Sequence, residues 1–385
     1  RDRLNITFKI ILTFYVLLFS LVYFTLQSNS RSMVGTIIFQ DPAQDLTVTK
    51  HNNAIPEVYE LIENMVWGTK GPRFYKINTQ VKIDNSVKPD FLLLYIKEKF
   101  AGMCTISHRD VYFGKDWLPT FYLQFFAIKP EYQGKAYGNV LVESVRDHYA
   151  SLAKKPTVSY AYIEGENVRS DKVAHFIKYK HASRFLTILF GRMFPKRSAF
   201  CRRFETSEKN KITALLKDYY KDYSFVHFEY AFNADNYWVL EKEGEILAGV
   251  QAHPQQWKFV NLPGWSGKFI LNILPNIPIA KRLFNAKHHK FLCFESHYCK
   301  EGHEHDLVNL MEHCLAEYGK TSGMTWFDPR SPLFQKLDKL NPWGILDKIQ
   351  GKHKANIYAK LHNIPESSWE DFTNKPFYIA AYDCV

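Results

Sequence analysis

The chain has 385 residues, of which 46% are hydrophobic and 23% are charged, and this composition excludes a disordered chain. At roughly 150 residues per domain, its length predicts two or three domains, and an aromatic content of 16% favours sheet-rich cores. The 50 Lys and Arg residues outnumber the 39 Asp and Glu residues, giving a formal net charge of +11. A basic surface suits an anionic partner, whether nucleic acid, an anionic membrane or a phosphorylated cofactor.

An apolar run occupies the start of the chain. Residues 10–26 carry no charge, and this length is at the short end of what spans a bilayer. Arg1, Arg3 and Lys9 precede the run. We interpret residues 1–32 either as a membrane anchor or as an extension that does not belong to the folded protein.

The hydrophobic pattern from residue 45 to residue 190 predicts a mixed sheet with helices on its faces. The predicted order is β-α-β-β-β-α-β-α-β. The strands are expected at residues 45–50, 91–96, 100–107, 121–128, 157–163 and 185–190. The helices are expected at residues 57–67, 139–152 and 171–181.

A similar order recurs in the rest of the chain. A helix is expected at residues 209–220, a hairpin at 237–240 and 246–253, a strand at 291–295 and a helix after it. Ala248-Gly249 repeats the Ala101-Gly102 step of the first hairpin, and Glu312 takes the place of Glu143. We therefore predict two copies of one α+β fold with a mixed α/β sheet. The boundary is expected near residues 195–203, giving units at 33–195 and 196–385, with an insertion at 263–290 in the second.

The segment with the clearest chemistry is FFAIKPEYQGKAYG, which joins the apolar strand at residues 121–128 to the helix at 139–152. Gln133, Ala136 and Gly138 fit the pattern [Q/R]-x-x-[G/A]-x-[G/A]. Small residues let the backbone turn tightly, and the following helix directs unpaired N–H groups and a positive dipole end into the turn. Such a turn binds a pyrophosphate, and Lys135 adds positive charge.

This segment resembles the phosphate loop of the GNAT superfamily of acyl-CoA N-acyltransferases, and the resemblance covers about residues 46–191. It implies a tandem duplication of a GNAT-like fold and acetyl-CoA, or another acyl-CoA, as co-substrate. It also implies that the backbone of Phe126, Ala127 and Ile128 pairs with the pantetheine arm. The pyrophosphate would be held by the loop residues Gln133, Gly134, Lys135, Ala136, Tyr137 and Gly138.

The chain departs from the family pattern after the fifth strand. Asn167 fits the expected cofactor-contacting Asn, but Phe176 is followed by Ile177 where the family has a catalytic Tyr. Tyr179 is the candidate acid, although a continuous helix would rotate it about 200° from the expected position. Glu164 is the candidate base for the amine. The alternative without a catalytic role is a half-buried aromatic for Tyr179 and a solvated strand-end carboxylate for Glu164. His108 and Gln124 are weaker candidates.

The corresponding loop of the second half is SHYCKEGHEHD. Glu301, Glu304 and Asp306 satisfy the helix dipole themselves and repel phosphate. We therefore expect no cofactor in the second copy. Its insertion either walls the acceptor pocket or packs between the domains.

The six cysteines show no C-x-x-C pair, which is typical of free thiols in a reducing compartment. Cys293, His297, Cys299, His303 and nearby histidines match no familiar zinc spacing, so no metal is expected. A cytoplasmic location is expected, with a membrane contact only through residues 10–26.

The leading hypothesis is transfer of an acyl group, acetyl in the first instance, from CoA to an amine by direct attack. Two alternatives stay open: a Fem-like peptidyltransferase that uses aminoacyl-tRNA, and a non-enzymatic nucleic-acid-binding protein. Nucleic acid is not expected as a partner under the leading hypothesis. The sequence leaves the acceptor, the acyl-chain length and the oligomeric state open.

Overall fold

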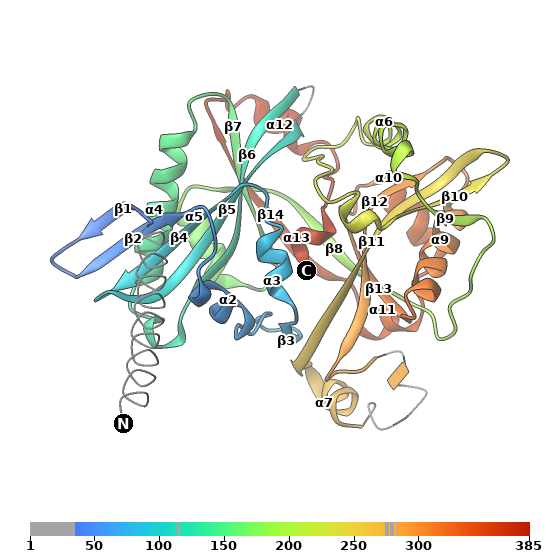
Figure 1. Cartoon of the computed structure of the whole chain (residues 1–385), viewed down its shortest axis with the longest axis horizontal. Helices are drawn as coiled ribbons and strands as arrows, with labels where there is room; N and C mark the ends of the chain where they lie inside the picture. Colours follow the sequence, from blue (N-terminus) through green and yellow to red (C-terminus); the bar gives the residue numbers. More distant parts are fainter. Residues whose placement is uncertain (1–34, 114–115, 274–276, 278–280, 283) are drawn as a thin grey trace, which may run out of the picture.

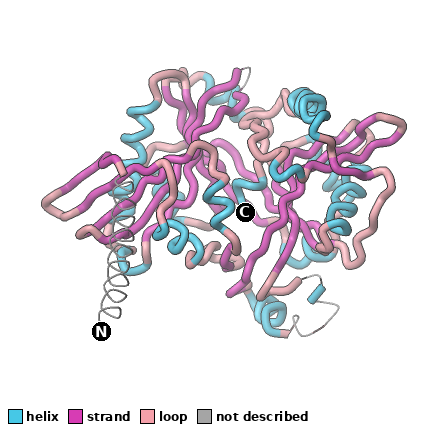
Figure 2. Tube along the Cα trace, in the orientation of Figure 1, coloured by secondary structure: helices cyan, strands magenta, loops and turns pink. Residues whose placement is uncertain are grey.

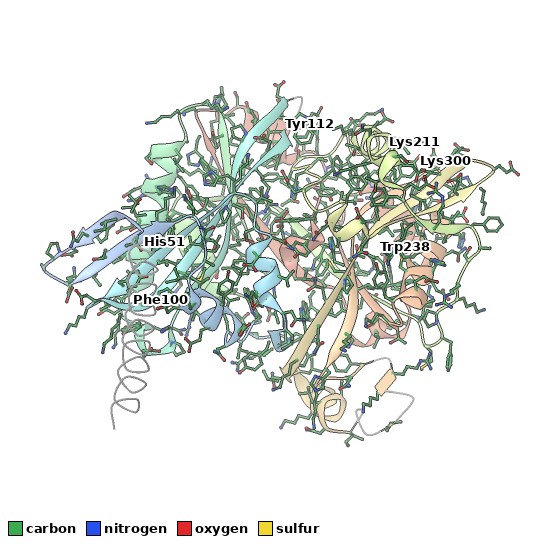
Figure 3. All side chains as sticks on the ribbon, viewed as in Figure 1. His51, Phe100, Tyr112, Lys211, Trp238 and Lys300 are labelled. Carbon is green, nitrogen blue, oxygen red and sulfur yellow. The ribbon has the colours of Figure 1, made fainter. Side chains whose placement is uncertain are left out.

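The computed structural model describes residues 35–113, 116–273, 277, 281–282 and 284–385. One large twisted sheet runs through both halves of the molecule, with helices packed against its faces (Figures 1 and 2). The first half carries Phe100 and the second half carries Trp238 in Figure 3. Within the described residues, no helix is both long enough and apolar enough to cross a bilayer. The hypothesis on residues 1–32 lies outside the described residues.

The elements of the first half follow the predicted order, with additions. Its strands are β1 Thr36–Asp41, β2 Leu46–His51, β3 Arg73–Lys76, β4 Pro89–Ile96, β5 Lys99–Phe113, β6 Asp116–Ile128, β7 Thr157–Glu164 and β8 Lys180–Gly191. Its helices are α2 Pro56–Glu63, α3 Thr79–Asp84, α4 Tyr137–Leu152 and α5 Val168–Phe176. Strands β1 and β3 and helix α3 were not among the elements that the sequence pattern predicts.

The second half repeats the arrangement with different lengths. Its strands are β9 Cys201–Arg203, β10 Tyr237–Lys242, β11 Glu245–Asn261, β12 His289–Cys299, β13 Ser322–Phe327 and β14 His353–His362. Its helices are α6 Lys209–Tyr219, α7 Gly264–Asn272, α9 Glu304–Glu317, α10 Pro332–Leu340, α11 Ile345–Gln350, α12 Ser368–Thr373 and α13 Ala381–Cys384.

The two halves exchange a strand at the centre of the sheet. The strand order is β1-β2-β4-β5-β6-β7-β14-β8-β13-β12-β11-β10-β9, with β3 paired to β11 outside this path. Strand β14 of the second half pairs with β7 of the first half, and β8 of the first half pairs with β13 of the second. Each half therefore completes its sheet with a strand from the other, which joins them into one hydrogen-bonded unit.

The duplication is confirmed by matching details of the two hairpins. Both turns have two central residues with positive φ, Lys97-Glu98 and Glu243-Gly244, as a type I′ turn requires. The pairing places Gly102 opposite Leu94 and Ala248 opposite Leu240. The two Ala-Gly steps are therefore one residue out of register, because the structurally equivalent residue of Gly102 is Ala248.

The predicted helix at residues 171–181 is wrong at both ends. Helix α5 begins at Val168, where the side chain of Asn167 accepts a hydrogen bond from the Ser170 amide, and it ends at Phe176. Lys178 adopts φ 61°, a left-handed conformation that stops the helix and returns the chain as strand β8.

Candidate functional site

Strands β6 and β7 lie parallel and then diverge. They pair from Thr120 with Val158 to Leu123 with Ala161, and beyond this point β6 continues beside β5 while β7 continues beside β14. The cause is a bulge in β6: Cys104 of β5 faces both Phe125 and Phe126, and Phe125 has φ 53°. The bulge leaves backbone groups of β6 facing the gap rather than β7.

The same bulge occurs in the second half. Val250 of β11 faces both Ser296 and His297 of β12, and Ser296 has φ 50°. The parallel pairing of β12 with β13 ends at Phe294 with Thr325, as that of β6 with β7 ends at Leu123. Both halves therefore contain the strand divergence.

A cavity of about 450 Å³ lies in the gap of the first half. Its walls come from the diverging ends of β6 and β7, from the central strands β8 and β14, and from β11 and β13 of the second half. The lining includes Phe125, Phe126, Glu164, Asn167, Tyr179, Thr187, Trp257, Phe259, Trp326, Ala355 and Asp383. Since both halves line it, the cavity is formed only in the complete fold. No described residue of the insertion at 263–290 is part of this lining.

The chain leaves β6 through a short 3₁₀ turn, Pro130–Tyr132, and enters α4 at Tyr137. Gly134 has φ 78°, and Ala136, which precedes the helix, has φ 63°. No side chain caps this end of the helix. The amides of residues 134–137 donate to no acceptor in the described part of the chain, and residues 133–136 are exposed. The loop therefore presents free N–H groups and the positive end of α4 to a ligand.

The side chains of the loop keep this position open. Gln133 turns inward and donates from Nε2 to the Ile128 carbonyl at 2.8 Å, which holds the loop against the end of β6. A Cβ atom added to Gly138 would make only ordinary contacts with Phe126 and Ile128, at 3.7 and 3.8 Å. Gly138 thus lies over the strand that leads from the cavity to the loop. The assignment of residues 133–138 to the pyrophosphate stays a prediction.

The position of Tyr179 does not follow from helix periodicity. Because α5 ends at Phe176, Tyr179 is not on the helix, and its amide donates to the Ala174 carbonyl at 2.9 Å in the turn that follows. The side chain is 3% exposed, and its hydroxyl lies beside the hydroxyls of Ser159 and Tyr149. Burial raises the pKa of Tyr179 well above its ordinary value, so the phenol stays protonated at neutral pH.

Glu164 and Asn167 lie at the end of β7 on the cavity wall. Thr69 donates from its hydroxyl to the Glu164 carboxylate at 3.0 Å, and the carboxylate is half-buried. The Asn167 side-chain oxygen caps α5, which leaves the amide nitrogen as the group available to a ligand. The structure thus brings both candidates to the same cavity as Tyr179.

Of the two weaker candidates, Gln124 and His108, only the first lines the cavity. Gln124 lines the cavity, but its Nε2 already donates to Ser107 Oγ at 2.7 Å. His108 lies outside the cavity lining, with its Nε2 2.9 Å from Asp90 Oδ2. Cys104 is buried behind the bulge, and burial raises the pKa of its thiol, which disfavours the nucleophilic thiolate.

The equivalent cleft of the second half is filled by its own side chains. Tyr220, His297 and Tyr378 are among the residues around a cavity of only about 20 Å³. At the start of α9, Asp306 pairs with Lys242 at 2.8 Å; burial alone would raise the Asp306 pKa, but its partners Lys242 and His303 lower it. These features support the prediction that the second copy holds no cofactor.

Two lysines and a tryptophan of the first half also line the cavity, and sequence reasoning missed them. Trp67 follows α2, Lys76 is on β3 and Lys82 is on α3. Strand β3 reaches the site by pairing with β11 of the second half, and no local sequence pattern signals such a pairing. Among the described residues, no group of three or more His, Cys, Asp or Glu side chains is arranged to hold a metal ion.

Comparisons with known proteins identify a family for part of the first half. Residues 56–176 match the model of the acetyltransferase (GNAT) family. A search of curated proteins gives no match. The Saccharomyces cerevisiae N-myristoyltransferase with bound myristoyl-CoA has a similar fold, with a TM-score of 0.56 at 10% identity over 82% of this chain and 79% of that chain.

A second similar structure is a GCN5-related glucosamine N-acetyltransferase region of a fungal multi-domain β-N-acetylglucosaminidase. Its TM-score is 0.51 at 12% identity, over 82% of this chain and 38% of that chain. At these identities the likeness concerns the fold alone, whereas the family match covers β6, α4 and the loop between them. Residues 56–176 of the chain therefore form a domain of the acetyltransferase (GNAT) family, which indicates an acyl-CoA-dependent N-acyltransferase.

Proposed function

We propose that the protein transfers an acetyl group from acetyl-CoA to an amine by direct attack of the neutral amine on the thioester. The observation that carries this proposal is the cavity between the diverging strands β6 and β7, which borders the strand leading to the open phosphate loop. The loop would hold the pyrophosphate, the edge of β6 from Phe126 to Ile128 would pair with the pantetheine arm, and the thioester would lie in the gap.

Each chemical step has a candidate group on the cavity wall. Backbone N–H groups at the bulge of Phe125 and Phe126 are placed to polarise the thioester carbonyl, because β5 offers one residue opposite the two. Glu164 would accept the proton of the ammonium, and Tyr179 would donate a proton to the departing thiolate. The buried and weakly acidic thiol of Cys104 favours direct transfer over a covalent enzyme intermediate.

The proposal is tested by calorimetry of acetyl-CoA binding with the Gly138→Glu variant. The new carboxylate would lie beside the phosphates, and we expect affinity to fall about 100-fold, equivalent to about 2.7 kcal/mol. The ordinary contacts available to a Cβ at Gly138 predict that the variant folds. Ala150→Glu, exposed near the other end of α4, is the control with the same added charge.

Equal affinity of Gly138→Glu and wild type would contradict the loop assignment. A series of acyl-CoA thioesters from acetyl to myristoyl then tests the acyl group, with amine-dependent release of CoA as the readout. The acetyl proposal requires the highest kcat/KM for the shortest chain. Preference for a long chain would assign the apolar wall of Trp257, Phe259 and Trp326 to the acyl group instead.

One feature supports the nucleic-acid alternatives. A second cavity in the second half, of about 660 Å³, is lined by Arg197, Lys281, Arg282, Lys290 and Lys320 together with polar residues. Such a concentration of positive charge suits phosphate groups. Salt-sensitive tRNA binding by a chain that does not bind CoA would favour these alternatives over acetyl transfer.

A further inference from the structure

Two lysines, one buried and one half-buried, meet on one wall of the central cavity. The Lys76 ammonium donates to the Cys384 carbonyl at 3.2 Å, and the Lys82 ammonium donates to the neighbouring Asp383 carbonyl at 3.2 Å. Both residues line the cavity, and Lys76 is 8% exposed. Because their acceptors are adjacent carbonyl oxygens of α13, the two ammonium groups lie close together.

Neither lysine forms an ion pair within the part of the chain that the structure describes. The Asp383 carboxylate also lines the cavity, but its two oxygens accept hydrogen bonds from Arg109 at 2.8 and 3.1 Å. Each ammonium has three N–H donors, and one of them donates to a backbone carbonyl. Burying cations without a counter-charge costs several kcal/mol per ion. Burial accordingly lowers the pKa of Lys82 to about 8 and that of Lys76 below its ordinary value.

The surroundings of the lysines are aromatic. The Lys76 ammonium lies 4.1 Å from the centre of the Trp67 ring, and the Lys82 ammonium lies 5.6 Å from that of Phe125. Phe125 is the bulge residue of β6, so Lys82 stands beside the point where the thioester is expected. Glu164, the candidate base, is on the same cavity but belongs to β7. The cavity thus has a cationic wall from β3 and α3, whereas its candidate base comes from β7.

We propose that Lys76 and Lys82 form an anion subsite for the acceptor, so that the substrate amine carries a carboxylate or a phosphate within the same small molecule. This inference rests on the proposed N-acyl transfer and assigns the acceptor class to the same cavity. An anionic group between the two ammoniums supplies the missing counter-charge and orients the amine toward the thioester at Phe125. The aromatic side chains around the lysines exclude water, which strengthens the ionic contact.

The test measures binding without turnover, using two matched pairs of N-acetylated products in the presence of CoA. N-acetylphenylalanine is compared with N-acetylphenylalaninamide, and N-acetyl-O-phosphoethanolamine with N-acetylethanolamine, by calorimetry at pH 7. We expect the anionic member of one pair to bind at least 10-fold more tightly than its neutral partner. The pair that shows this difference identifies the anion as a carboxylate or a phosphate.

Lys82→Met and Lys76→Met are expected to abolish the difference within that pair and to leave the neutral member unchanged. Methionine is similar in size and removes the cost of burying an unpaired charge, so both variants are expected to fold. Lys211→Met is the control, since Lys211 is exposed on the outer helix α6, away from the centre of the molecule (Figure 3). Denaturant midpoints and CoA affinity of the variants check that the fold is intact.

Equal affinities within both pairs for the wild type would overturn the anion subsite, as would equal losses for anionic and neutral members in the lysine variants. This outcome is separate from failure of the proposed function. A chain that does not bind CoA fails the calorimetry of acetyl-CoA itself, whereas a chain that binds CoA but shows no anion preference retains the acyltransferase and loses only the acceptor class.

Discussion

Tyr179 shows how a single side chain is placed by its surroundings rather than by its helix. Tyr179 lines the cavity, and its hydroxyl is buried beside the hydroxyls of Ser159 and Tyr149, two residues outside the lining. Tyr149 provides a comparison, because its hydroxyl is buried beside that of Tyr179, whereas its side chain lies outside the cavity lining and stacks on Phe121.

We predict that Tyr179→Phe lowers kcat by about 10- to 100-fold with little change in KM for acetyl-CoA, because the variant loses a proton donor and keeps the ring. The melting temperature should change little, since the variant keeps the buried ring and its packing. Tyr149→Phe, the matched control, should retain kcat. Steady-state kinetics and thermal unfolding of both variants check this, and an unchanged kcat in Tyr179→Phe would remove it from the mechanism.

At the scale of elements, the short turn after α5 determines where β8 begins and therefore which of its side chains line the cavity. Lys178 is exposed and adopts a left-handed conformation. Glycine adopts this conformation without steric cost, whereas a residue with a Cβ atom pays a cost. The sequence KYKH carries no glycine at this position, which is why the pattern predicts a helix that runs to residue 181. The tertiary contacts of Tyr179 and of β8 with β14 stabilise the turn instead.

We predict that Lys178→Gly stabilises the protein by up to about 1 kcal/mol, because it relieves the left-handed strain at the helix end. Lys172→Gly, an exposed position inside α5, should instead destabilise it by about 1 kcal/mol. Urea unfolding of the two variants measures the opposite signs. Equal destabilisation by both would contradict the account of the turn.

At the scale of the whole molecule, a buried charged cluster joins the two halves. Arg109 of β5 donates to both oxygens of Asp383 in α13, and Arg109 Nη1 lies 3.0 Å from His227 Nε2. The Arg109 and Asp383 side chains are almost fully inaccessible to solvent. Together with the exchange of β8 and β14, this cluster makes the folding of one half depend on the other.

We predict that Asp383→Asn destabilises the protein by about 3–5 kcal/mol at neutral pH, because it leaves Arg109 buried without its counter-charge. Burial alone would raise the Asp383 pKa, but Arg109 and His227 lower it to about 2. A carboxylate whose pKa is lower in the folded state contributes stability at pH values above about 4, and this contribution is lost as the pH falls toward 2.

The stability difference between wild type and Asp383→Asn should therefore narrow as the pH falls from about 4. Denaturant unfolding at several pH values measures it. Asp147→Asn on α4, where the Asp147 side chain is 68% exposed, should change stability by less than about 0.5 kcal/mol. A difference that stays constant between pH 5 and pH 3 would show that the Asp383 carboxylate is not held ionised by the cluster.

The sequence by itself determined the features that depend on neighbouring residues. The apolar strand, the turn with Gly134 and Ala136, and the helix after it are contiguous, so their local conformational preferences predict both the strand–loop–helix unit and its open N–H groups. The same holds for the two hairpins, whose repetition indicates the duplicated fold. These predictions succeeded because the interactions that form the elements span only a few residues.

Only the tertiary structure decided which strands meet at the centre and which side chains face the cavity. The exchange of β8 and β14, the pairing of β3 with β11, and the meeting of Lys76 and Lys82 with α13 join residues as much as about 300 positions apart. Such contacts arise from the packing of the complete sheet, in which many weak interactions of similar free energy compete. No pattern within one segment contains this total, so the strand–loop–helix unit was predictable from the sequence, whereas the lysine wall of the cavity was not.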